Sequence, residues 1–325
     1  MPLKKRLAIT AKILSLPATV GRPLFDKNSI PHRSQTEYLA KVNRPDVKGH
    51  WIVRDAYRAS NRLQKIEKSI YEADLVMYYI HGGGFKIGNS TMYMDSFIHI
   101  IEHLRKTKGL DVRIFSVDYD MMPDVKYSKT KQDAMKGYMY LIQDLKINPK
   151  KVIVAGDSAG GNLVAGLMLS LRDLNLPNLP QPAGNITISP WISIDNKAKP
   201  RPGFVYEDCL DFSMVEGFIG DYFTSETDDV DKLHEILQKP EISPLSASTF
   251  KGICPTLVTY GSTEIFQHDD EAFVKRLQQD DVQVDVITSK APHVWIISPM
   301  LSPTYQLWKT DCTRLADWCA KTVRK

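Results

Sequence analysis

The sequence predicts an α/β fold in which a mostly parallel central sheet is covered by helices on both faces. Between residues 70 and 300, short apolar runs alternate with amphipathic segments of helical length. Most runs are continuously apolar, which is typical of strands buried on both faces. A chain of 325 residues with 43% hydrophobic residues can also enclose one large core. We therefore expect a single domain over residues 1–325.

The expected elements follow one another in a regular order of strand and helix. Candidate strands cover residues 73–80, 112–119, 151–156, 185–191, 255–261 and 282–289. Amphipathic stretches between them include residues 95–107, 130–144, 160–173 and 268–280. Strands that alternate with helices in this way indicate a parallel sheet with helices on its two faces.

Two regions lie outside this order. Residues 1 to about 50 contain no convincing strand, and residues 198–248 form an aromatic and acidic insert that includes "FVYEDCLDFSMVEGFIGDYF". Long connections over a cleft commonly serve as lids. We expect about residues 1–48 and 198–248 to form a helical cap on the single domain.

The N-terminal segment "MPLKKRLAITAKILSLPATV" predicts an amphipathic helix with basic residues on its polar face. Its apolar run is broken by Lys12, unlike the core of a signal peptide. No stretch of the chain approaches the roughly 18 apolar residues that a membrane span needs. The helix is expected to cover part of the protein, and peripheral contact with a membrane surface is the alternative. We expect a cytoplasmic protein, with attachment to an intracellular membrane and homodimer formation left open.

The composition argues against several classes of protein. The net charge is +4, and no basic stripe with interleaved aromatic residues indicates a nucleic acid partner. The four cysteines lack a CxxC pair, which argues against a zinc site or a disulfide framework. Free thiols in a reducing compartment are the expected state of Cys209, Cys254, Cys312 and Cys319.

The run "KVIVAGDSAGGNLVAGLML" places G-x-S-x-G between a predicted strand and a predicted helix. In that context the turn is tight, and the two glycines leave room for a serine held in strained backbone angles. Ser158 is then exposed at the positive end of the following helix, where a developing negative charge is stabilised. The pattern alone occurs by chance in about one chain in ten, so a glycine-rich turn with an incidental serine is the alternative.

The glycine triplet in "YYIHGGGFKIGNS" also follows a predicted strand, where it would weaken strand pairing. A serine nucleophile that attacks an acyl group creates an oxyanion, and each preorganised donor to it is worth about 3–4 kcal/mol. Bare backbone amides can supply such donors because glycine lets the chain approach a substrate closely. The expected oxyanion hole consists of the amides of Gly83, Gly84 and Ala159.

A serine nucleophile needs a base, and the base needs a carboxylate that holds its tautomer. His293 lies in "KAPHVW" directly after the last predicted strand and is the expected base. Glu264 follows the strand 255–261 and is the expected acid, with Asp269 or Asp270 as alternatives. The cluster "HDDE" does not indicate a metal site, because neighbouring residues on a helix point in different directions. No metal and no cofactor are expected.

Taken together, "HGGGF", "GDSAGGNL", "SPWISID", "EISPLSA" and "YGSTEIFQHDD" resemble the hormone-sensitive-lipase-like branch of the α/β-hydrolases. The nearest resemblance is to fungal esterases similar to the steryl acetyl hydrolases, over about residues 48–320. It implies a serine carboxylesterase for short- to medium-chain acyl esters, in which Asp157 braces the serine turn and Trp191 lies near the acyl pocket. Glu264 departs from the family, where aspartate is commoner, and the first 45 residues match poorly.

The expected partner is therefore a small-molecule acyl ester. Aromatic residues of the cap are candidates for contact with it, and plain packing within the cap is the alternative for each. The residues expected to line the substrate pocket are Phe85, Trp191, Phe212, Phe218 and Tyr222. Lipase or amidase activity of the same three residues is the alternative function. The rival class is a non-catalytic binding protein like the gibberellin receptor, which shares the scaffold but lacks the base.

Overall fold

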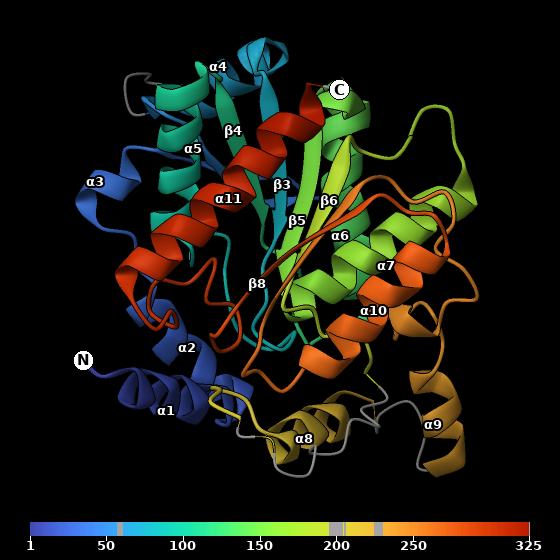
Figure 1. Ribbon diagram of the computed structural model, residues 1–325. Coiled ribbons are helices and arrows are strands. Elements are labelled where there is room, and N and C mark those ends of the chain that lie inside the picture. The colour runs from blue at the N-terminus through green and yellow to red at the C-terminus, as the bar shows by residue number, and fades with distance from the viewer. Residues whose placement is uncertain (57–60, 195–203, 205, 224–229, 325) are drawn as a thin grey trace.

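The computed structural model describes residues 1–325 apart from 57–60, 195–203, 205, 224–229 and 325, and it forms one eight-stranded sheet flanked by helices (Figure 1). The strands are β1 (Leu39–Asn43), β2 (Lys48–Ile52), β3 (Leu75–Ile80), β4 (Val112–Val117), β5 (Val152–Asp157), β6 (Gly184–Ile188), β7 (Thr256–Gly261) and β8 (Val284–Ser289). The helices are α1 (Leu3–Leu14), α2 (Ala18–Asn28), α3 (Arg33–Thr36), α4 (Arg62–Ser69), α5 (Met94–Lys108), α6 (Tyr127–Met139), α7 (Ala159–Leu174), α8 (Phe212–Phe223), α9 (Val230–Leu237), α10 (Gln267–Gln279) and α11 (Tyr305–Val323).

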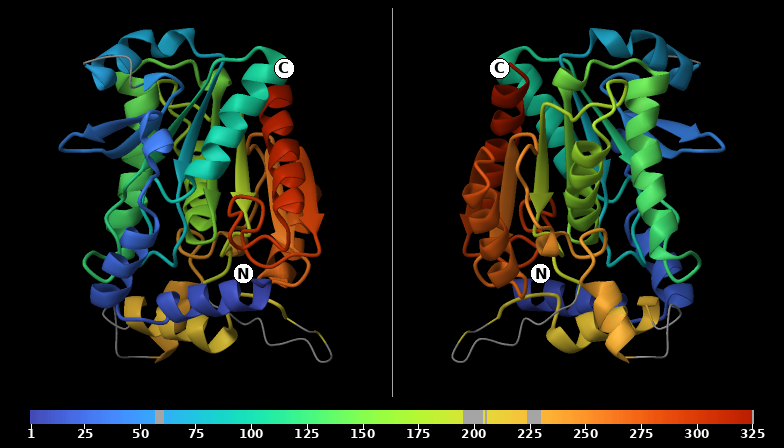
Figure 2. Two further views of the ribbon diagram at one scale, coloured as in Figure 1. Left: turned by 90° about the vertical axis from the view of Figure 1, so that its left-hand side faces the viewer. Right: turned by 90° about the vertical axis from the view of Figure 1, so that its right-hand side faces the viewer.

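The sheet confirms the predicted α/β class and its mostly parallel arrangement. Its strand order is β1-β2-β4-β3-β5-β6-β7-β8, and the strands from β3 to β8 run parallel. Every residue of β3, β4, β5 and β6 is buried, because helices cover both faces. Helices α5 and α11 pack together on one face, and α6, α7 and α10 cover the other (Figure 2).

The expectation of no strand before residue 50 is wrong. Strands β1 and β2 form an antiparallel hairpin, and β2 pairs antiparallel with β4 at the edge of the sheet. Each has only five residues, and polar side chains such as Lys41 and Lys48 alternate with buried ones such as Val42. A short, half-exposed edge hairpin gives no continuous apolar run, so its sequence signal is weak.

Four helices gather at one end of the molecule, and the C-terminus lies at the opposite end (Figure 1). Helices α1, α2, α8 and α9 come from the two regions that were expected to form a cap. Helix α1 confirms the predicted amphipathic helix: Leu7 and Leu14 are buried, and Lys4, Lys5 and Lys12 are exposed. None of the helices in the described parts of the chain combines the length and hydrophobicity needed to cross a membrane.

Candidate active site

Ser158 occupies the sharp turn between β5 and α7. Its φ of 52° and ψ of −120° are strained for a residue with a side chain. The neighbouring glycines are needed because the turn is crowded: a Cβ on Gly160 would overlap the carbonyl oxygen of Ile80. Ser158 directly precedes the first residue of α7, is 7% exposed, and lines a cavity.

The glycine loop after β3 lies against the same cavity. Gly83 and Gly84 both line it, with φ values of 97° and 61° that suit glycine. A Cβ on Gly84 would come within 3.2 Å of the Phe218 ring. The backbone amide of Ala159 belongs to the first turn of α7, directly after Ser158. The three amides expected to form an oxyanion hole are thus grouped around the serine turn.

Asp157 ties the glycine loop to the serine turn. Its carboxylate accepts hydrogen bonds from the amide of Gly82 (2.9 Å) and from the hydroxyls of Tyr79 (2.8 Å) and Tyr93 (2.7 Å). Burial raises the pKa of Asp157, and these hydrogen bonds together with His81 act in the opposite direction. His81 itself is 1% exposed and stacks on a tyrosine ring, so it braces this loop and does not face the cavity.

His293 and Glu264 face each other beside the cavity that Ser158 lines. The Nδ1 of His293 lies 3.9 Å from Oε1 of Glu264, and neither atom has a hydrogen bond within the described part of the chain. The other oxygen of Glu264 accepts from the Ser189 hydroxyl (2.8 Å) and from the Gly261 amide (2.9 Å). These two donors hold the carboxylate so that Oε1 points to the imidazole. Sequence reasoning missed Ser189, which also accepts the Val294 amide.

The pKa of His293 is raised above 6.5. Burial lowers it, but the carboxylates of Glu264, Asp208 and Asp157 outweigh that effect. The aromatic ring of Phe266 packs edge-on against the imidazole, with 5.4 Å between ring centroids. The imidazole of His293 thus has carboxylates and the ring of Phe266 as neighbours.

The two alternative acids take other positions. Within the described residues, the imidazole of His293 pairs with Glu264 and not with Asp269 or Asp270. Asp270 is fully buried next to Glu264, and burial followed by the charge of Glu264 raises its pKa well above the usual range. A neutral Asp270 can donate a hydrogen bond to Glu264, whereas an ionised one would repel it.

Asp208 is a further carboxylate at the site that sequence reasoning did not identify. It belongs to the insert before α8, yet its Oδ1 accepts the amide of His293 (3.2 Å) and its Oδ2 accepts the amide of Ile265 (3.0 Å). The preceding residue, Glu207, also donates its amide to the carbonyl of Thr263 (3.0 Å). One short segment therefore fastens the cap to the loops that carry His293 and Glu264.

The cavity that Ser158 and His293 share has a volume of about 410 Å³. Helices α1, α2 and α8 contribute apolar side chains to it, among them Ile13 and Phe218. Of the predicted pocket residues, Trp191 and Phe218 line it. Phe85 and Phe212 do not, which corrects their assignment: Phe85 is buried behind Trp191, and Phe212 packs on the ring of Tyr206. The side chain of Tyr222 lies outside the described residues.

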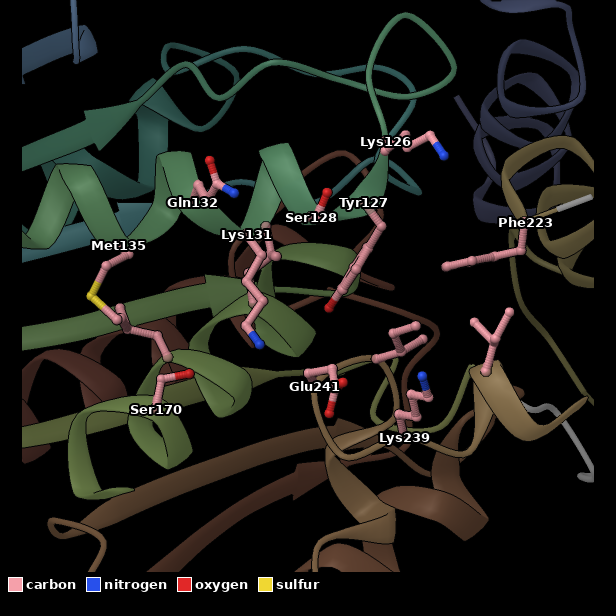
Figure 3. Close-up of a pocket in the computed structure, with 14 residues that line it drawn as sticks. Lys126, Tyr127, Ser128, Lys131, Gln132, Met135, Ser170, Phe223, Lys239 and Glu241 are labelled. Carbon is pink, nitrogen blue, oxygen red and sulfur yellow. The ribbon is translucent and has the colours of Figure 1, made fainter. Parts of the chain in front are cut away.

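A second cavity of about 550 Å³ lies between α6, α7 and the segment that follows α9 (Figure 3). Its lining mixes apolar residues with polar and charged ones, among them Lys131, Lys239 and Glu241, and it includes neither Ser158 nor His293. Tyr127 lines this cavity and packs edge-on against Phe85, which separates it from Trp191 of the first cavity. The group of residues that can carry out nucleophilic chemistry therefore belongs to the smaller cavity.

A serine on a strained turn, an imidazole with an oriented carboxylate, and backbone amides beside them are the components of a nucleophilic hydrolase. Their order along the chain, with the serine first, the acid second and the histidine third, is that of the α/β-hydrolases. A family described as alpha/beta hydrolase fold matches residues 77–297. The chain belongs to this family.

Curated relatives support the same grouping. An esterase of Acinetobacter venetianus is 29% identical over 219 residues, which cover 67% of this chain and 66% of that protein. An ethyl acetate hydrolase of Pseudomonas putida is 26% identical over 220 residues, which cover 66% of this chain and 63% of that protein. The chain thus matches a little less than two thirds of the length of these relatives.

Solved structures share the whole fold. An esterase from the bacterial hormone-sensitive lipase family aligns with a TM-score of 0.75 and 22% identity, covering 99% of this chain and 98% of that structure. An esterase/lipase from an uncultured bacterium aligns with a TM-score of 0.75 and 21% identity, covering 98% and 99%. At this level of identity the likeness establishes the fold.

Proposed function

We propose that the protein is a carboxylic ester hydrolase in which Ser158 is the nucleophile. The observation that carries this proposal is the strained serine at the N-terminus of α7, in one cavity with His293, whose Nδ1 faces Glu264. The names of the relatives, an esterase and an ethyl acetate hydrolase, point to the same reaction.

The reaction follows from the chemistry of the grouped residues. Ser158 attacks the ester carbonyl while His293 accepts its proton, and Glu264 stabilises the imidazolium that forms. The amides of Gly83, Gly84 and Ala159 hold the negative oxygen of the tetrahedral intermediate. His293 then protonates the leaving alcohol, and an acyl-enzyme remains. Water, activated by the same imidazole, releases the acid and restores the serine.

The size of the cavity favours short- to medium-chain acyl esters. A volume of about 410 Å³, with apolar walls from α1, α2 and α8, suits a small lipophilic ester. We expect hydrolysis of p-nitrophenyl esters to be fastest for short acyl chains and to fall steeply by dodecanoate. A chain-length series of these esters, with a sterol acetate included, measures the preference. Fastest turnover of the dodecanoyl ester would contradict this size argument and favour a lipase.

Replacing Ser158 by alanine tests the mechanism itself. The Ser158→Ala variant should lose about 10⁶-fold in kcat on p-nitrophenyl butyrate, because no other group can form the acyl-enzyme. A fluorophosphonate probe followed by peptide mass spectrometry should label Ser158 in the wild type. The control is Ser298→Ala, because Ser298 lines the same cavity but has no such turn. Labelling that persists in Ser158→Ala and disappears in Ser298→Ala would refute the assignment.

A further inference from the structure

Exposed apolar side chains concentrate where the cavity opens. Six of the eleven large apolar side chains that are exposed in the described part of the chain lie on α1 or just before it, on α2 with the residue pair after it, or on the loop beside α1. These six are Met1, Ile9, Val20, Leu24, Ile30 and Met300. Single exposed apolar residues need no explanation, but clusters of them mark contact surfaces.

Three of these residues belong to the cavity wall as well. Ile9, Ile30 and Met300 line the cavity that holds Ser158, and they are 37%, 68% and 45% exposed. A residue that both lines a cavity and is exposed marks its entrance. Arg6 connects α1 to the loop beside it at this entrance, because its guanidinium donates to the backbone carbonyls of Met300 (2.7 Å) and Ser302 (3.0 Å). We call the surface formed by α1, α2, residues 29–30 and residues 299–303 the entrance face.

Basic residues accompany the apolar ones. Residues 1–37 hold seven basic and two acidic side chains, so their net charge of +5 exceeds the +4 of the whole chain. Lys4, Lys5 and Lys12 are exposed on α1, which has no acidic residue in the helix. Lys5 and Lys12 stand four before and three after Ile9, on the same side of the helix. Positive charge and an exposed apolar side chain thus share one side of α1.

We infer that the entrance face docks onto an anionic lipid surface. An interfacial helix combines lysines, which attract anionic headgroups, with apolar side chains that enter the boundary of the acyl chains. A hydrated, polar interface with an acidic protein would pair with the lysines but would leave the apolar side chains of Ile9, Val20 and Leu24 exposed to water. The inference rests on the proposed function: docking would serve ester hydrolysis by letting a lipophilic ester pass from the lipid directly to Ser158.

Flotation with vesicles tests the docking without any ester. The full-length protein is mixed with vesicles of phosphatidylcholine alone, or of phosphatidylcholine with phosphatidylserine, at low and high salt. We expect binding to the vesicles that contain phosphatidylserine, weakened by salt. Replacing Lys4, Lys5 and Lys12 by glutamine should lower the partition coefficient by roughly tenfold to a hundredfold. The Val20→Gln, Leu24→Gln variant should lower it by about tenfold even at low salt.

Matched variants elsewhere separate docking from a general loss of charge or of apolar surface. Lys65, Lys68 and Lys275 are exposed on α4 and α10, and their replacement by glutamine should leave binding unchanged. The Leu174→Gln, Leu176→Gln variant should also bind the vesicles as the wild type does, since both leucines are exposed but lie outside the entrance face. Hydrolysis of p-nitrophenyl butyrate should be equal in all four variants, so failure of docking is distinct from failure of the reaction. Equal binding to both vesicle types would overturn the inference. It would also be overturned if the wild type were a dimer that the Val20→Gln, Leu24→Gln variant dissociates, because the face would then be a dimer interface.

Discussion

At the scale of single residues, the ionisation of His293 is expected to control activity at low pH. Only the neutral imidazole can accept the proton of Ser158, and nearby carboxylates raise the pKa of His293 above 6.5. As pH falls through this raised pKa, His293 is protonated and kcat/KM should decline. The midpoint of the acid limb in the wild type is therefore expected above pH 6.5.

Replacement of Asp208 by asparagine should change this profile. The Asp208 carboxylate helps to raise the pKa of His293, so loss of its charge should move the acid limb to lower pH. Asparagine also has one acceptor oxygen for the amides of His293 and Ile265, and kcat should fall about tenfold through poorer alignment. The pH dependence of p-nitrophenyl butyrate hydrolysis measures both effects.

Asp211 provides the control for this substitution. It is exposed three residues further along the chain and accepts the amide of Met214 at the start of α8. Asp211→Asn removes the same charge without touching the His293 loop, so its acid limb should stay in place. An unchanged profile in Asp208→Asn would show that Asp208 only packs the cap against the domain.

Sequence reasoning singled out Ser158, Glu264 and His293, which the structure brings together at one cavity, and missed Asp208 and Ser189, which contact them. Ser158 stands in a motif whose spacing is set by a strained turn, so a single sequence reveals it. Asp208 and Ser189 act through contacts with chain segments far away, and an isolated polar residue gives no pattern to read. Phe85 was expected to line the pocket, but its φ is 57° and its fully buried ring stacks on Trp191 outside the cavity lining.

At the scale of elements, two of the three glycines of helix α7 have opposite expected effects on stability. A Cβ at Gly160 would lie within 2.6 Å of the carbonyl oxygen of His81 and overlap that of Ile80, which are backbone atoms at the end of β3 and the start of the glycine loop. A Cβ at Gly166 would meet nothing within 4 Å. Gly160→Ala should therefore destabilise the protein by about 3 kcal/mol, and Gly166→Ala should stabilise it by about 0.5–1 kcal/mol.

Urea unfolding of the two variants measures these free energies. Each serves as the control for the other, since both add one methyl group to the same helix. A loss of stability in Gly166→Ala equal to that in Gly160→Ala would mean that helix α7 tolerates no added volume at all, and that the close approach to β3 is not the cause.

The elements with a strong apolar pattern were the predictable ones. Strands β3 to β8 and helices α5, α7 and α10 lie within a few residues of their expected ranges, because apolar runs and amphipathic helices leave strong patterns. The hairpin β1–β2 was missed because its polar edge residues interrupt the pattern. The helical content of the N-terminal region was foreseen from α1, but not how α1 and α2 meet the cavity.

At the scale of the whole molecule, the candidate site is assembled from segments spread over nearly the entire chain. Its cavity takes residues from α1, from the loops after β3 and β5, from α8 and from the loop after β8. The position of Ser158 is fixed by the sheet, which a parallel α/β pattern specifies well. The walls depend on α1, α2 and α8, whose packing angles no local pattern specifies. A net charge of +4 for the chain also conceals the basic character of its first 37 residues.

The hydrogen bonds that Arg6 makes have a consequence for handling the protein. Its guanidinium reaches the carbonyls of Pro299, Met300, Ser302 and Pro303, so the first turns of the chain fix the stretch just beyond His293. A bulky group attached close to Arg6 would crowd that attachment, whereas helix α11 ends at the opposite pole of the molecule (Figure 1). Handles for capture, labelling or immobilisation therefore belong near the end of α11.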